Sequence, residues 1–284
     1  MRILVTGANG QLGYDLIKEL EAREITALGV DIEDIDITDA HGVKHVIEEA
    51  NVDAVIHCAA YTAVDAAEDN VDLCMDVNEK GTINIAKVCK ELDIKMMYIS
   101  TDYVFNGEGD THWKPEDDCS PINVYGESKY KGELVVKELL DKFFIIRISW
   151  VFGVNGNNFV KTMLRLSKTN KEISVVNDQV GSPTYTADLA ILLSDMIVTE
   201  KYGIYHATNE GFCTWYEFAV EIFNQGNIDI LVHPIKSEAY PTKAKRPQNS
   251  RLDKSKLATN GFKLLPPWQD AVKRYISDIA TPPL

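Results

Sequence analysis

The feature that most constrains the fold of this chain is a glycine-rich turn after its first apolar segment. The run Arg2–Thr6 predicts a short β-strand, and Gln11–Ala22 predicts an amphipathic helix. Gly7, Gly10 and Gly13 mark the turn between them and the first residues of the helix. Glycines at this spacing permit a tight turn, close backbone approach to a pyrophosphate and close helix–strand packing. Because a helix N-terminus also attracts anions, we predict a dinucleotide-binding turn.

The rest of the first half repeats the strand–helix alternation. Further strands are predicted over Ile25–Val30, Ala54–Cys58, Lys95–Ser100 and Phe143–Ile148, and helices over Ala40–Ala50, Val71–Leu92 and Val124–Leu140. Such alternation implies parallel strands joined by helical crossovers. The strands are nearly continuous apolar runs, which is typical when helices cover both faces of a sheet. We therefore predict an α/β fold with a Rossmann-type, doubly wound parallel sheet.

The pattern loosens after Trp150. Helices are predicted near Phe159–Lys168, Thr186–Thr199 and Trp215–Gln225, with loops that contain glycine and proline between them. We predict a dinucleotide-binding domain over residues 1–150 and a smaller α/β lobe, mostly for substrate, over residues 151–284. The two are expected to interleave, with approximate boundaries.

Composition excludes several classes of partner. The formal net charge of −14 over 284 residues argues against nucleic acid, whose phosphates need clustered Lys and Arg. No apolar run approaches the roughly 18 residues that span a bilayer, so we expect no membrane partner. The five cysteines are scattered and lack C-x-x-C spacing. They predict thiols in a reducing cytoplasm, with neither a disulfide framework nor a metal site.

Several positions beyond the glycine turn are predicted to contact the cofactor. Asp31 closes the second strand, where it can bond an adenosine ribose and favour NAD over NADP. It also belongs to an acidic stretch that is consistent with a solvated loop, so NADPH and NADH both stay open. His57 ends an apolar strand and is interpreted as a hydrogen-bonded core histidine. The predicted cofactor contacts are Gly7, Gly10, Gln11, Leu12, Gly13, Asp31, Asp36, Ile37, Ala59, Ala60, Tyr61, Thr62, Tyr125 and Lys129.

A second group of residues predicts proton transfer. Tyr125 and Lys129 lie four residues apart in a predicted helix, so they share a face. A lysine beside a tyrosine lowers a phenol pKa that starts near ~10, and such a tyrosine can exchange a proton at neutral pH. Thr101 ends the fourth strand, where open α/β sheets place their ligands, and can donate to a carbonyl oxygen. Together these catalytic candidates predict hydride transfer between a nicotinamide and a carbonyl or alcohol carbon.

These motifs resemble the extended short-chain dehydrogenase/reductases that act on nucleotide sugars, and more narrowly the dTDP-4-dehydrorhamnose reductase family. The resemblance covers nearly the whole chain and includes Ala59–Asp65, Ser100–Phe105, Asn123–Glu127, Ser149–Phe152, Asn157–Phe159 and Arg246–Leu252. It implies reduction of the C4 ketone of dTDP-4-dehydro-β-L-rhamnose to dTDP-L-rhamnose by NADPH or NADH. Tyr125 would protonate the new alkoxide, with assistance from Lys129 and Thr101.

The resemblance also implies a substrate site. Thr101, Asp102 and Trp150 would lie against the sugar, although Trp150 is also consistent with a core position because it follows an apolar strand. Asn158, Arg246 and Arg251 are candidates for the diphosphate, together with Lys245. Arginine suits phosphate through its planar fork, while a solvated basic loop is the alternative interpretation.

Metal binding and assembly are less constrained. Some members of the resembled family are Mg²⁺-bridged dimers whose metal is held by glutamates. Here the first predicted helix carries Asp15, and the stretch Tyr185–Asp188 contains no glutamate. We therefore expect no metal site, and either a monomer or a homodimer.

Two other functions fit the same fold. One is a non-catalytic dinucleotide-binding subunit like the regulatory subunit of methionine adenosyltransferase; Thr101 and Trp150 favour a reductase over it. The other is a nucleotide-sugar epimerase or 4,6-dehydratase. Dehydratases usually place Asp-Glu after the threonine of the fourth strand, whereas here Thr101 is followed by Asp102 and Tyr103.

Overall fold

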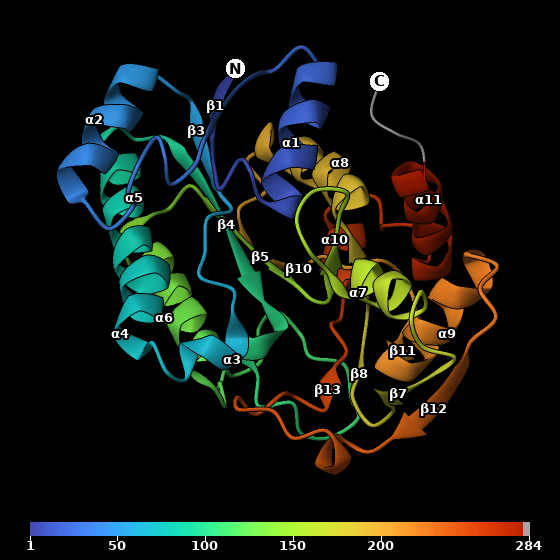
Figure 1. Cartoon of the computed structure of the whole chain (residues 1–284). Helices are drawn as coiled ribbons and strands as arrows, with labels where there is room; N and C mark the ends of the chain where they lie inside the picture. The colour runs from blue at the N-terminus through green and yellow to red at the C-terminus, as the bar shows by residue number, and fades with distance from the viewer. Residues whose placement is uncertain (281–284) are drawn as a thin grey trace.

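The core of the molecule is a six-stranded sheet in the order β10-β5-β4-β3-β1-β2, in which every neighbouring pair is parallel (Figure 1). The computed structural model describes residues 1–280, so the last four residues of the predicted second lobe lie outside it. The strands are β1 (Arg2–Thr6), β2 (Thr26–Val30), β3 (Ala54–His57), β4 (Lys95–Thr101), β5 (Phe143–Ile148) and β10 (Gly203–His206). The strand order reverses at β1, which lies between β2 and β3, and ligands bind at such switch points.

Helices cover both faces of this sheet. Ile3 and Val5 of β1 pack in one buried cluster with α1 (Gln11–Ala22) and α8 (Thr186–Ile197). Leu4, between them, packs in the opposite cluster with α2 (Ala40–Ala50) and α5 (Gly81–Glu91). This alternation follows from the two-residue period of a strand. The helix α6 (Val124–Leu139) lies on the second face as well (Figure 1). The predicted doubly wound parallel sheet is confirmed.

One predicted helix is interrupted. The segment Val71–Leu92 was expected to be continuous, but it forms α4 (Val71–Met75), a π-helical turn (Asp76–Lys80) and α5. Single π turns inside helices often occur at functional sites. This turn carries Asn78, which is almost fully buried beside α6.

A smaller lobe gathers around a third buried cluster, in which Phe152, Phe218 and Tyr275 take part. Its elements are α7 (Phe159–Leu166), β7 (Glu172–Val176), α9 (Trp215–Gln225), β12 (Leu231–Ile235) and α11 (Trp268–Ala280). Short strands form two further small sheets, in the orders β11-β8-β13 and β6-β9: β6 (Val151–Phe152), β8 (Val180–Gly181), β9 (Thr184–Tyr185), β11 (Cys213–Thr214) and β13 (Asn249–Ser250). The remaining elements are the short helices α3 (Val64–Ala67) and α10 (Ser255–Thr259) and two 3-10 helices, Asp102–Val104 and Ser237–Ala239.

Segments after residue 150 also belong to the large sheet. The strand β10 pairs with β5, and α8 packs on α1. The division of the chain near residue 150 stays a prediction. Within residues 1–280, every helix is too short or too polar to cross a membrane.

Candidate active site

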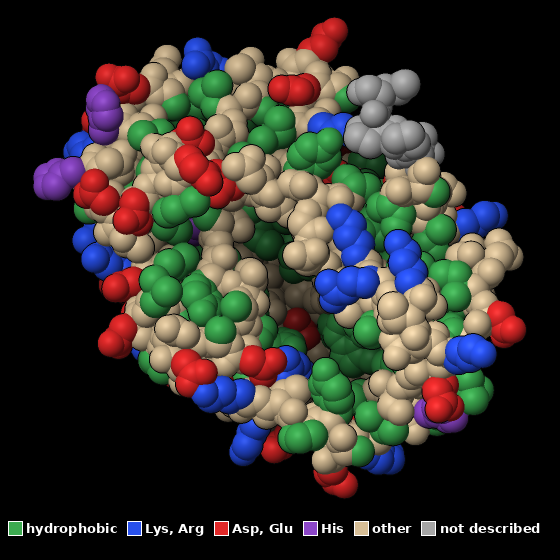
Figure 2. All heavy atoms as spheres, in the orientation of Figure 1, with side chains coloured by type: hydrophobic (Ala, Val, Ile, Leu, Met, Phe, Trp, Pro, Cys, Tyr) green, Lys and Arg blue, Asp and Glu red, His purple; other side chains and the backbone are tan. Residues whose placement is uncertain are grey.

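A cavity of about 980 Å³ lies at the carboxyl ends of the central strands, between the large sheet and the smaller lobe. Figure 2 shows this hollow near the middle of the visible face, with hydrophobic side chains inside it. Residues of the glycine turn line one part of it, and Thr101, Tyr125 and Lys129 line another. The segments that we singled out separately in the sequence therefore meet around one space.

The glycine turn is held by contacts that exclude side chains. Gly7 has a φ of +68°, and a Cβ there would lie 2.7 Å from the Ala59 nitrogen. A Cβ on Gly13 would lie 2.2 Å from the Gly7 carbonyl oxygen. Gly10 is the N-cap of α1 and provides no side-chain cap for the first N–H groups of that helix. The turn thus presents a close-packed backbone and a helix N-terminus to the cavity, as a pyrophosphate requires.

The acidic stretch after β2 contributes to the same cavity. Asp31 accepts hydrogen bonds from the Asn9 and Ile32 backbone nitrogens, both at 2.8 Å, and so ties this stretch to the glycine turn. Asp36 accepts from the backbone nitrogen and hydroxyl of Thr38, and these bonds lower the pKa of its carboxyl. Asp31, Asp36 and Ile37 all line the cavity, so this stretch is not merely a solvated loop.

The loop after β3 also contributes to the cavity. Ala59, Ala60 and Thr62 line the wall, but Tyr61 does not. The Tyr61 backbone instead donates to Asn78 Oδ1 at 2.8 Å and accepts from its Nδ2 at 3.1 Å. The Asn78 amide also donates to Ser128 Oγ at 2.9 Å. The buried asparagine of the π turn therefore joins this loop to α6.

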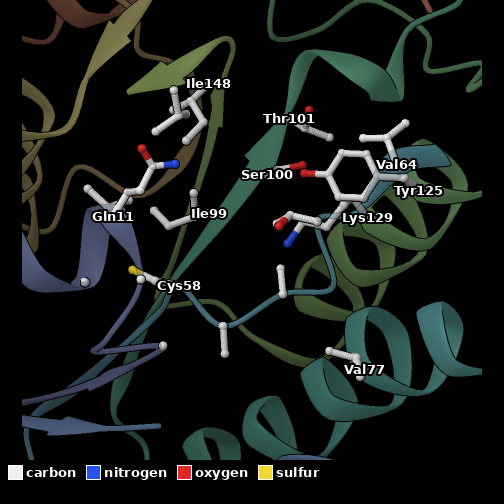
Figure 3. A pocket seen from close by; sticks show the side chains of 18 of the residues that line it. Gln11, Cys58, Val64, Val77, Ile99, Ser100, Thr101, Tyr125, Lys129 and Ile148 are labelled. Atoms are coloured by element: carbon white, nitrogen blue, oxygen red, sulfur yellow. The ribbon is translucent and has the colours of Figure 1, made fainter. Parts of the chain in front are cut away.

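Tyr125 and Lys129 project from α6 toward the end of β4, where Ser100 and Thr101 lie (Figure 3). Asn123 caps this helix by accepting from the Gly126 nitrogen at 2.7 Å, which sets where its first turn begins. The Lys129 ammonium lies 4.0 Å from the centre of the Tyr98 ring. Gly126 is needed here, because a Cβ would lie 2.2 Å from the Tyr103 carbonyl oxygen.

Burial dominates the acid–base chemistry of this pair. Desolvation raises the pKa of Tyr125, and hydrogen bonding to Thr101 only partly opposes it. We expected Lys129 to lower the tyrosine pKa, and the structure gives the opposite direction because desolvation of the phenol is the largest influence on that pKa. Desolvation also lowers the pKa of Lys129 to about 7, against the charge of Glu133, which raises it. Tyr125 is consequently a protonated phenol at neutral pH, which suits a proton donor.

His57 is a core residue, as interpreted from the sequence. Its Nδ1 lies 2.7 Å from Thr6 Oγ1 and its Nε2 lies 3.3 Å from Thr82 Oγ1. Burial lowers its pKa to about 3, so the ring is neutral.

Another part of the cavity wall carries an acid and a pair of stacked indoles. Asp102 is buried, accepts from Ser250 and Thr101, and has a pKa raised to about 6 by desolvation. Trp150 lines the cavity with a φ of +50°, a left-handed conformation that is rare for a bulky residue. Its ring stacks on Trp215 of α9 with centroids 3.7 Å apart. Trp150 is thus part of the wall as well as packed against a neighbour.

The four predicted diphosphate contacts are placed differently, and Lys245 does not line the cavity. Arg246 lines the cavity and pairs with Asp65 through both guanidinium branches, at 3.0 and 2.6 Å. Asn158 caps α7 and donates to Gln11, Gly153 and Tyr275, so its amide is committed within the protein. Arg251 donates to the side chain of Asn249 at 3.0 Å. Only Arg246 is brought to the cavity wall.

No three His, Cys, Asp or Glu side chains gather into a possible metal site among residues 1–280. Asp15 accepts from Thr186, and Asp188 pairs with both Arg274 branches at 2.7 Å and with Asn209. Both carboxylates thus have partners within the chain.

Comparison with known proteins agrees with the geometry. The family described as "RmlD substrate binding domain" matches residues 1–281. A protein of Aggregatibacter actinomycetemcomitans named dTDP-4-dehydrorhamnose reductase is 42% identical, over 96% of this chain and 97% of its own. The chain belongs to the dTDP-4-dehydrorhamnose reductase family. Membership makes it an oxidoreductase of the kind expected from the sequence.

Two solved structures from this family superpose closely on the chain. A dTDP-4-dehydrorhamnose reductase of Bacillus anthracis in complex with NADP has a TM-score of 0.95 at 45% identity, over 98% of this chain and 99% of its own. A dTDP-4-dehydrorhamnose reductase ortholog of Clostridium acetobutylicum has a TM-score of 0.97 at 41% identity, over 99% and 100% of the two chains. The family assignment thus extends to the whole architecture.

Some members of the cavity wall were missed by the sequence reasoning. Trp215, Ser100 and Tyr103 line it, although none was among the predicted site residues. The capping box of Thr214 and Glu217 marks where α9 begins and so places Trp215 in its first turn. Nothing local indicates that this indole stacks on Trp150, since that contact joins two distant segments.

Proposed function

We propose that this protein reduces the C4 ketone of dTDP-4-dehydro-β-L-rhamnose to dTDP-L-rhamnose with NADPH or NADH, and that Tyr125 is the proton donor. The observation that carries the proposal is the convergence of Thr101, Tyr125 and Lys129 with the glycine turn on one cavity. The names of the relatives and the NADP complex of the Bacillus anthracis reductase support the substrate and the cofactor.

The cofactor would lie across the switch point of the sheet. Its pyrophosphate would meet the N-terminus of α1, beside Gly7 and Gly10, where no side chain obstructs the backbone. Asp31 and Asp36 would face the adenosine end, and Lys129 the nicotinamide ribose. When bound, the reduced nicotinamide supplies the hydride.

The protein's part in the reaction is to place the ketone and deliver a proton. Thr101 donates a hydrogen bond toward the C4 oxygen, and Tyr125 gives its phenolic proton to that oxygen as the alkoxide forms. Because burial raises the pKa of Tyr125, the phenol holds its proton until a stronger base appears beside it. Lys129, when charged, stabilises the tyrosinate that is left behind.

The sugar would pack against Trp150, close to the buried Asp102, and the diphosphate would approach Arg246. The Arg246 guanidinium is paired with Asp65, so its position is fixed before substrate arrives. Asn158 and Arg251 would act on the substrate only indirectly, through the segments that they hold. The enzyme would work in the cytoplasm, as a monomer or a homodimer.

The test is oxidation of NADPH and of NADH, followed by absorbance, with enzymatically generated dTDP-4-dehydrorhamnose and purified protein. We expect turnover that requires the sugar, with dTDP-L-rhamnose as the product. Absence of oxidation with both cofactors would refute the proposal. A spectrum of the purified protein separates the rival epimerase, which keeps its NAD through each cycle, from a reductase, which releases the oxidised cofactor.

A further inference from the structure

A buried charge network lies directly behind the proposed proton donor. Glu133 follows Lys129 by one helical turn on α6 and is completely buried. Arg147 of β5 is bonded to it twice, from Nε at 2.9 Å and from Nη2 at 2.7 Å. Ser100 of β4 donates its hydroxyl to Glu133 Oε1 at 2.5 Å. One carboxylate therefore connects α6 to two adjacent strands of the sheet.

We propose that Glu133 is a positioning residue of the active site, which holds the end of β4 against α6 and supplies the negative charge that faces Lys129. The proposal rests on the proposed function. Ser100 immediately precedes Thr101, so the bond to Glu133 fixes the strand end from which Thr101 projects. The same helix carries Tyr125 and Lys129, and the carboxylate thus sets the spacing between the two sides of the proton-transfer site.

The second part of the role is electrostatic. Burial acts to remove the charge of Lys129, and Glu133 is the strongest of the groups that oppose this. The titratable groups that face Lys129 from the packed elements are His57, Cys58, Cys74, Tyr98, Tyr125 and Glu133. Burial raises the pKa of both cysteines and lowers that of His57, so these three are neutral at pH 7. Glu133, whose carboxylate is paired with Arg147, is the only carboxylic acid in this set.

A purely structural interpretation makes a different prediction. A buried ion pair between α6 and β5 that served folding alone would affect stability, without a selective effect on Lys129. The two interpretations therefore separate in a measurement on Lys129 itself.

The experiment is an NMR titration of the Lys129 side chain in protein labelled with ¹³C at lysine Cε, with the signal assigned from Lys129→Met. It needs no substrate or cofactor, so its result is independent of whether the reaction is assigned correctly. In Glu133→Gln the Lys129 midpoint should fall by roughly one pH unit or more. Glu138→Gln, the same change at an exposed position of α6, should leave it in place. An unmoved midpoint in folded Glu133→Gln would overturn the electrostatic role.

Ser100→Ala tests the mechanical role and keeps the Glu133–Arg147 pair, so it serves if Glu133→Gln does not fold. We expect kcat to fall about tenfold or more while cofactor affinity stays unchanged. The reason is that the variant loses the bond that fixes the end of β4, so only the position of Thr101 becomes less well defined. Ser100→Thr, which retains the hydroxyl, should recover most of the rate. Wild-type kcat in Ser100→Ala would remove the positioning role.

Discussion

The cavity has two walls that are held by different forces. The glycine wall, formed by Gly7, Gly10 and Gly13, is placed by backbone contacts that leave no room for a Cβ at two of its three positions. The tyrosine wall, formed by Thr101, Tyr125 and Lys129, consists of buried polar side chains held by capping, hydrogen bonds and the charge of Glu133. Steric exclusion is local and insensitive to pH, whereas a buried charge network responds to protonation. Substitutions in the two walls should therefore fail in different ways.

The largest effect on activity is expected from a substitution in the tyrosine wall. We expect Tyr125→Phe to lower kcat at least ~100-fold, because it removes the proton donor and leaves the packed ring. Cofactor affinity, measured by fluorescence titration of NADPH, should stay close to wild type. Full activity in this variant would take Tyr125 out of the reaction.

A substitution in the glycine wall should instead weaken cofactor binding and lower stability. Gly13→Ala places a Cβ 2.2 Å from the Gly7 carbonyl oxygen, so the turn must shift. We expect cofactor affinity to fall about tenfold or more and stability to drop by about 1–3 kcal/mol, as for other overpacked sites. Gly10→Ala is the matched control for stability, because its Cβ would lie 3.1 Å from the same oxygen and its φ of −76° suits any residue. An equal loss of stability in both variants would contradict the steric explanation.

The burial of Lys129 in the tyrosine wall should make the stability of the protein depend on pH. Its folded-state pKa of about 7 lies below the usual 10.5, so the folded protein binds fewer protons than the unfolded chain between these values. Stability from this group therefore rises as pH increases from 7 toward 10.5. At pH 6 the free energy of unfolding of Lys129→Met, measured by denaturant titration, should exceed that of the wild type by on the order of 1 kcal/mol or more. The variant should also lose the increase in stability between pH 7 and 10.5.

The matched control for that variant is Lys137→Met, at an exposed position of the same helix. It should keep the pH dependence of the wild type. A parallel gain in both variants would mean that the effect comes from helix propensity or surface charge, rather than from burial of Lys129.

The smallest effect is expected from the stacked indoles of Trp150 and Trp215, which line the same cavity. Trp215→Ala removes the ring on which Trp150 rests, and aromatic pairs contribute about 0.5–1.5 kcal/mol. We expect the KM for the dTDP-sugar to rise about 3- to 10-fold, with a smaller change in kcat. Trp215→Phe, which keeps an aromatic ring, should stay near wild type. An unchanged KM in Trp215→Ala would show that the stack does not support the substrate site.

The sequence predicted the glycine wall more completely than the proposed substrate contacts. The strand, turn and helix that build this wall are consecutive, so periodicity and glycine spacing were sufficient, and the bounds of β1 and α1 were predicted as observed. Arg246 and Trp150 were predicted to contact the substrate, and both line the cavity. Asn158 was predicted to contact the diphosphate, but its side chain is hydrogen-bonded to Gln11 and Tyr275. A polar residue in a motif does not reveal whether its partners are ligands or protein groups.

By itself the sequence determined the order of strands and helices, the dinucleotide turn, and the helical spacing of Tyr125 and Lys129, because these depend on residues close together in the chain. Only the tertiary structure decided the direction of the tyrosine pKa, the stack of Trp215 on Trp150, and the link from Glu133 to Ser100 and Arg147. Those features depend on burial and on contacts between distant segments. Desolvation is a property of the folded environment, so no spacing of residues can express it.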